Sequence, residues 1–127
     1  MTAIVTAFRP KDQVFQDAAP VAAMYRDLGT VRAEREVTRV LGELALAMSN
    51  LADRVRAHEM ADLGRQFRLL EHKSEQLGLV SLGQVAGDAR ICLERRDSTA
   101  FSAVWARLLR VAERCLIADP AALDWGP

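Results

Sequence analysis

The sequence lacks a long apolar run, an excess of either charge, and all but two cysteines. Its apolar runs are only a few residues long, far short of the ~20 residues that a membrane span needs. Arg9 and Lys11 follow a short apolar patch instead of preceding a long one, which is the wrong order for a signal peptide. Lys and Arg total 17, as do Asp and Glu, so the basic excess of a nucleic-acid-binding protein is missing. We therefore expect a cytoplasmic protein that binds neither membrane nor nucleic acid.

Glycine, proline and aromatic residues are also scarce. Seven Gly and four Pro interrupt a chain that is 50% hydrophobic and 6% aromatic, and such a composition favours helix packing. Cys92 and Cys115 fall at apolar-leaning positions of expected helices, so we expect buried, reduced thiols instead of a disulfide or a metal site. A chain of this length is expected to form one domain, residues 1–127, without cross-links.

Apolar residues recur at three- and four-residue spacing through most of the chain, which predicts helices with one buried face each. We expect helices over 20–28, 31–58, 61–77, 80–96 and 98–118. The short connections favour an all-α fold, an antiparallel up-down four-helix bundle over residues 30–118. An irregular N-terminal arm with the short extra helix, residues 1–29, precedes the bundle, and a loose tail, residues 119–127, follows it.

Each long helix has a stripe of residues that we expect to face the core. The stripes are Val37, Val40, Leu41, Leu44, Met48, Leu51 and Val55; Leu63, Phe67, Leu70, Ser74 and Leu77; Leu82, Val85, Ala86, Ala89 and Leu93; and Phe101, Val104, Trp105, Leu108, Val111 and Cys115. In the arm, we expect a short extended piece at Ala3–Phe8, and Phe8 and Phe15 indicate that the arm docks.

Several residues indicate where helices begin, end or cross. Thr30 is expected to cap the helix that follows it, and Asp97 or Ser98 the last helix. Gly78 is expected to end the second long helix. Gly42 lies inside a helix, where it costs roughly 1 kcal/mol against Ala, so we expect a close helix crossing there.

The segment 67–97 carries the most specific pattern in the chain. Gly78 joins two amphipathic runs, Leu82 and Ala86 follow it, and Arg96-Asp97 precedes the last expected helix. Without a gap, this segment resembles the histidine-containing phosphotransfer domain, in which a helix-ending Gly is followed by a Leu, a small residue and a Gly-Asp pair. The resemblance implies a four-helix bundle that exchanges phosphoryl groups with response-regulator receiver or histidine-kinase domains. It implies no cofactor, because the receiver supplies the Mg²⁺ and the carboxylates.

The positions that carry the family's chemistry depart from its pattern. Arg68 takes the place of the phosphoryl-accepting His, Glu71 that of a Lys, and His72 that of a Gly. His72 shares a helix face with Arg68 and is the candidate catalytic residue, because a neutral imidazole is a competent nucleophile. Glu71 and Glu75 would repel a phosphoryl group of roughly −2 charge.

We therefore favour a degenerate, unphosphorylated face on which charged residues pair along the helix at i,i+3 and i,i+4. This face would bind the receiver or kinase. Its expected residues are Arg65, Arg68, Leu69, His72, Lys73, Glu75 and Gln76.

Other interpretations remain open. The chain could be a structural or oligomerising helical bundle, such as a homodimer, which would expose apolar residues along a whole helix. Leu46 and Ile91 are the candidates, although we favour second-layer core positions for both. His58 is expected to play a structural role at a helix end. His72 and Glu75 lack a second pair of ligands, so no metal is expected, and an enzyme with its own active site is the least favoured interpretation.

Overall fold

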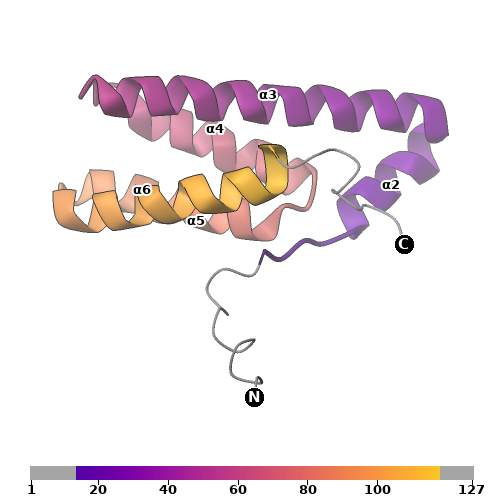
Figure 1. Cartoon of the computed structure of the whole chain (residues 1–127). Helices are drawn as coiled ribbons and strands as arrows, with labels where there is room; N and C mark the ends of the chain where they lie inside the picture. Colours follow the sequence, from indigo (N-terminus) through magenta and orange to yellow (C-terminus); the bar gives the residue numbers. More distant parts are fainter. Residues whose placement is uncertain (1–13, 118–127) are drawn as a thin grey trace, which may run out of the picture.

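The computed structural model describes residues 14–117, and the regular secondary structure of this part of the chain consists of helices, without strands (Figure 1). The helices are α2 (Ala19–Leu28), α3 (Thr30–Arg56), α4 (Leu63–Gln76), α5 (Val80–Glu94) and α6 (Ser98–Ala112), and α6 runs on into a π-helical turn, Glu113–Ile117. All the expected helices are therefore present. The piece at Ala3–Phe8 and the tail 119–127 lie outside the described residues. None of the described helices has the length and apolar character that crossing a membrane requires.

The helices pack as a bundle around one apolar core. Figure 1 shows α3 running along one side of the molecule, α4 beside it, and α5 and α6 forming the opposite side, while α2 folds back from the start of α3. The fully buried large side chains come from every long helix: Val40, Leu44, Leu51, Leu63, Phe67, Leu70, Leu77, Leu79, Leu82, Val85, Leu108 and Cys115. The expected stripes are confirmed, except that some members are only partly buried against the core: Leu41, Val55, Leu93, Val104 and Trp105.

An aromatic cluster joins α4 to α6 across the core. The Phe67 ring lies edge-on to Phe101 and Trp105, with centroids 6.1 and 6.2 Å away. Phe101 and Trp105 stack nearly parallel at 6.3 Å. Such pairs add to the stability gained from burial alone, so Phe67 anchors α4 at the centre of the bundle.

The turns after α3, α4 and α5 use the same backbone motif. In each turn one residue has positive φ: His58 (57°), Gly78 (69°) and Arg96 (55°). The N–H of the residue after it bonds back to a carbonyl of the last helical turn, as in Leu79 N to Ser74 O at 2.9 Å. This is the Schellman arrangement, which satisfies carbonyls at a helix end. Because His58 and Arg96 take this conformation, α3 and α5 end at Arg56 and Glu94, two residues earlier than expected.

The helix starts follow the expectations in part. The Asp97 side chain accepts a hydrogen bond from the Ala100 N–H at 3.0 Å and caps α6. The expected cap at Thr30 is wrong, because Thr30 is already the first residue of α3. Gly29, with φ 83°, ends α2 and turns the chain directly into α3, which leaves Thr30 no position outside the helix.

The close helix crossing lies on α5, and not at Gly42. Gly42 is exposed, and a Cβ added there would meet no atom within 4 Å. On α5, a Cβ at Gly83 would lie 3.5 Å from the Ser74 Cβ, and one at Gly87 would lie 3.0 Å from Glu71 Oε1. The missing side chains of Gly83 and Gly87 therefore let α5 pack closely on α4.

The residues before α2 dock on the turn between α4 and α5 through their backbone. The Phe15 N–H donates to Ser81 Oγ at 2.7 Å, and the Ser81 N–H donates to the Phe15 carbonyl at 3.2 Å. The Asp17 N–H donates to the Gly78 carbonyl at 2.7 Å. The Phe15 ring itself is 58% exposed, so this segment docks through its main-chain groups and through Val14, which packs partly buried against the core. Phe8 lies outside the described residues.

Replacing Gly78 by Ala should destabilise the protein, because its φ of 69° is strained for any residue with a Cβ and that Cβ would lie 1.9 Å from the Asp17 carbonyl oxygen. The backbone strain alone predicts a loss of ~1–2 kcal/mol in the free energy of unfolding, measured by urea denaturation. Gly42→Ala is the matched control and should stabilise by ~1 kcal/mol. Equal effects of the two substitutions would contradict this role of Gly78.

Candidate functional site

The outer face of α4 carries nearly all of the residues that the sequence assigns to a binding face. Arg68 and His72 lie one turn apart on it, and both are exposed, Arg68 with 70% of its side chain accessible. Leu69 is 44% exposed, so it adds an apolar side chain to this surface. Arg65, Glu75 and Gln76 are exposed as well. The structure therefore brings six of the seven expected residues onto one accessible surface.

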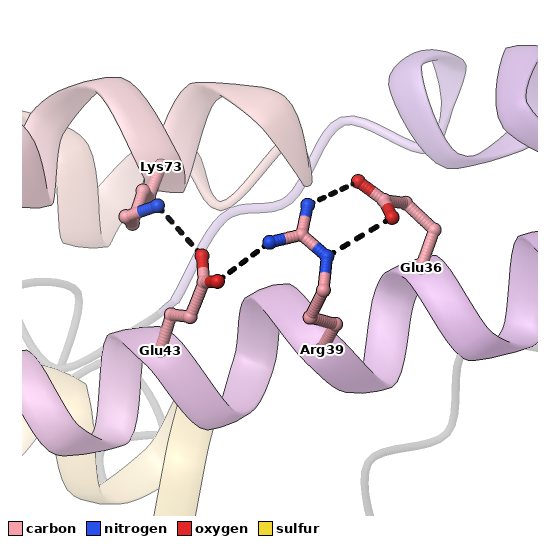
Figure 2. Close-up of polar contacts among 4 residues, drawn as sticks. All are labelled: Glu36, Arg39, Glu43 and Lys73. Atoms are coloured by element: carbon pink, nitrogen blue, oxygen red, sulfur yellow. Dashed lines mark hydrogen bonds and ion pairs between the residues drawn. The ribbon is translucent and has the colours of Figure 1, made fainter.

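Lys73 is the exception, because it turns towards α3. Its Nζ lies 2.7 Å from Glu43 Oε1, and only 22% of its side chain is exposed. Figure 2 shows the chain of contacts that continues from Glu43 to Arg39 and Glu36 along α3. Arg39 holds Glu43 Oε2 at 2.5 Å and both oxygens of Glu36, through Nη2 at 2.5 Å and Nε at 3.1 Å. Lys73 thus ties α4 to α3 instead of facing a partner.

These contacts shift the acidity of the carboxyl groups on α3. The hydrogen bond from Lys73 holds the pKa of Glu43 below its ordinary value, with a further contribution from the charge of Arg39. The hydrogen bond from Arg39 likewise lowers the pKa of Glu36. Both carboxylates are therefore stabilised in their charged form by cations that the fold brings to them.

On the other side of α4, Arg68 and Glu71 belong to an ion-pair network with α5. Arg90 donates two hydrogen bonds to Glu71, from Nε to Oε2 at 2.7 Å and from Nη2 to Oε1 at 3.4 Å. It donates a third from Nη1 to Oε2 of Glu94 at 3.1 Å. Arg68 Nη2 lies 3.7 Å from the same Glu94 oxygen. The hydrogen bonds to Glu71, and then to Glu94, raise the pKa of Arg90.

This network replaces the pairs that the sequence suggested along α4. Charges at i,i+3 and i,i+4 on one helix were expected to pair with each other, but Arg68 and Glu71 contact residues of α5 instead. The close approach at Gly87 explains the difference, because it brings Arg90 within reach of Glu71. Glu71 is only 25% exposed as a result.

The two histidines have different environments. His72 is exposed, and among the hydrogen bonds and ion pairs of residues 14–117 none involves its ring. Neither ring nitrogen is therefore oriented by a neighbour, as it is in most catalytic histidines. His58 occupies the positive-φ position just after α3, where its backbone forms the turn that ends the helix.

The two cysteines differ in burial. Cys115 is fully buried, and burial raises the pKa of its thiol to about 11, so the thiol stays protonated at neutral pH. Cys92 is partly buried, and both are free. Within the described residues, no group of three or more His, Cys, Asp or Glu side chains is placed to hold a metal ion.

Sequence reasoning missed Arg90 and Glu94, which complete the network around Arg68. Their i,i+4 spacing on α5 was visible, and so were Gly83 and Gly87 one turn apart. Together these features could have indicated a helix that approaches its neighbour closely and pairs charges across the contact.

Comparison of the chain with protein-family models, with curated proteins and with solved structures found no match.

The lowered pKa of Glu43 predicts a pH dependence of stability. A carboxyl group whose pKa is lower in the folded than in the unfolded state stabilises the fold at pH values above its unfolded-state pKa. This stabilisation is lost as the pH falls through the folded-state pKa. Acid titration below the ordinary Glu range should therefore lower the free energy of unfolding, and should lower it less in Glu43→Gln. Glu34→Gln, at an exposed carboxylate of α3 outside this network, is the control and should retain the wild-type profile. A Glu43→Gln profile identical to wild type would refute the contribution of the Lys73–Glu43 pair.

Proposed function

We propose that the chain is a signalling module like the histidine-containing phosphotransfer domains, which docks a receiver or histidine-kinase domain without carrying a phosphoryl group itself. The docking surface is the outer face of α4, with Arg68 at its centre. The observation that supports this most directly is Arg68 itself, exposed at 70% on the helix and at the position where the family presents its phospho-acceptor. A receiver built to approach a side chain at that position would meet a cation instead.

The arrangement of helices that goes with this proposal is an antiparallel up-down bundle of α3 to α6. In support, consecutive helices are joined by the short connections 57–62, 77–79 and 95–97, and α4 packs on both α3 and α5. The contact between Phe67 and the two aromatic rings of α6 fits diagonal helices that meet at the centre of such a bundle.

The residues that carry the family resemblance have environments that fit their expected roles. The Leu and the small residue of the pattern are expected on the inner side of the hairpin, and both Leu82 and Ala86 are fully buried. Arg96 has φ 55°, the conformation that a Gly would adopt most easily, and Asp97 caps α6. These features support a common framework for positions 78–97.

Acceptance of a phosphoryl group at the docking face is unfavourable in this proposal. A guanidinium keeps its proton in proteins, which makes it a poor nucleophile, so Arg68 is unsuited to accept the group. His72 lacks an orienting partner and lies beside Glu75, whose charge opposes a phosphoryl group. Arg68 can reach an acidic pocket at little cost, because its exposed contact with Glu94 at 3.7 Å is of the weak surface kind.

A structural or oligomerising bundle is the second candidate, and one observation favours it. Leu46 on α3 is 62% exposed, so its expected second-layer core position is wrong, and Ile91 on α5 is 37% exposed. Exposed apolar side chains also include Val31 and Leu109. They are spread over several helices, whereas a homodimer interface along one helix would concentrate them, and this distribution leads us to favour docking through α4.

Docking is tested by titrating purified receiver domains from the source organism against the labelled chain. Arg68→Ala should weaken the binding of the cognate receiver by about tenfold, as expected for the loss of one interfacial charge pair. Arg56→Ala is the matched control, because Arg56 is also an exposed Arg (72% accessible) that pairs with a carboxylate. Equal binding by both variants, or sedimentation of the free chain as a stable dimer with no receiver bound, would reject the proposal.

The absence of phosphotransfer is tested separately with a phosphorylated receiver and with an active hybrid kinase. We expect no acid-labile phosphate on the chain after either incubation. Label that appears on the wild type and disappears in His72→Gln would instead establish His72 as the acceptor.

A further inference from the structure

A groove of about 520 Å³ lies beside the Arg68 network, between α4, α5 and the segment that precedes α2. Its floor is the surface of α5, with a partly exposed apolar residue towards either end, Val80 at 38% and Ile91 at 37%. These two residues are about 16 Å apart along the helix, at 1.5 Å per residue. Apolar residues spaced over three turns of a partner helix can therefore contact both of them, since each turn rises about 5.4 Å.

The rim of the groove is acidic. Its charged lining consists of Asp17, Glu71, Glu75, Asp88 and Arg90. Arg90 is already neutralised by Glu71, at 2.7 Å. Asp88 has only a distant contact, 3.9 Å, with Arg107. Asp17, Glu75 and Asp88 thus leave an excess of negative charge around an apolar floor, and a basic partner complements such a surface.

The walls of the groove favour a helical partner over an extended one. Backbone N–H and C=O groups inside α4 and α5 are bonded within their own helices. An extended peptide would find no open ladder with which to pair, whereas a helix satisfies its own backbone. The apolar face of such a helix would lie against Val80 and Ile91.

From this geometry we propose that the groove binds a basic amphipathic helix of a partner protein, with apolar residues on α5 and Lys or Arg side chains opposite Asp17, Glu75 and Asp88. The proposal does not depend on receiver docking, because neither Arg68 nor His72 lines the groove. The two surfaces adjoin each other, and Glu75 belongs to both.

The probe is a fluorescein-labelled helical peptide of about 18 residues, with Leu on one face and Lys along both edges of that face. Fluorescence anisotropy should show saturable binding, with a dissociation constant on the order of 10–100 μM. Asp88→Lys should weaken binding by about tenfold, and so should Glu75→Lys, which leaves the contact with Arg107 intact. Glu34→Lys, a charge reversal on exposed α3 outside the groove, is the control and should bind like wild type.

Several outcomes would overturn the proposal. These are no saturable binding, equal binding by Asp88→Lys and Glu34→Lys, and equal binding of a peptide in which Glu replaces every Lys. Self-association of the free chain that Asp88→Lys abolishes would assign the groove to a second copy instead. Circular dichroism of each variant checks that a loss of binding does not reflect unfolding.

Discussion

The close packing of α5 on α4 is the constraint on which the site depends. Gly83 and Gly87 have no side chains, so α5 approaches until a Cβ at Gly87 would touch the Glu71 carboxylate at 3.0 Å. This approach places Arg90 on Glu71 and draws that carboxylate away from the outer face. Arg68, Leu69 and His72 are left facing outwards. The same approach forms the floor of the groove between the two helices.

Two ion-pair networks flank α4 and fix its rotation. On one side Lys73 reaches Glu43 of α3, and on the other Glu71 reaches Arg90 of α5. Exposed ion pairs contribute little to stability individually, whereas partly buried, bidentate contacts such as that of Arg90 constrain geometry. Together with Phe67 in the core, they determine which residues of α4 face solvent, and hence what a partner can contact.

Much of the fold could be predicted from the sequence, because the spacing of apolar residues determines which face of a helix is buried. Leu63, Phe67 and Leu70 were assigned to the core in this way and are fully buried. The helix ends were less predictable, since His58 and Arg96 adopt a backbone conformation that their residue types do not indicate. Gly42 was misinterpreted because a glycine marks a crossing only when it faces another helix, and this one faces solvent.

The candidate site was predictable only along α4 itself. Helical spacing correctly placed Arg68 and His72 on one exposed face. The partners of Arg68, Glu71 and Lys73 belong to other helices, and the spacing within one helix carries no information about the distance to the next. The groove depends on that same distance, so it too required the folded structure.

The central proposal is that a receiver or kinase domain docks on the outer face of α4. Its most direct test is to record amide chemical shifts of the ¹⁵N-labelled chain while the cognate receiver is added. The account predicts that the largest changes cluster between Arg65 and Gln76. Changes centred on Leu46 and the exposed side of α3, with α4 unaffected, would contradict it.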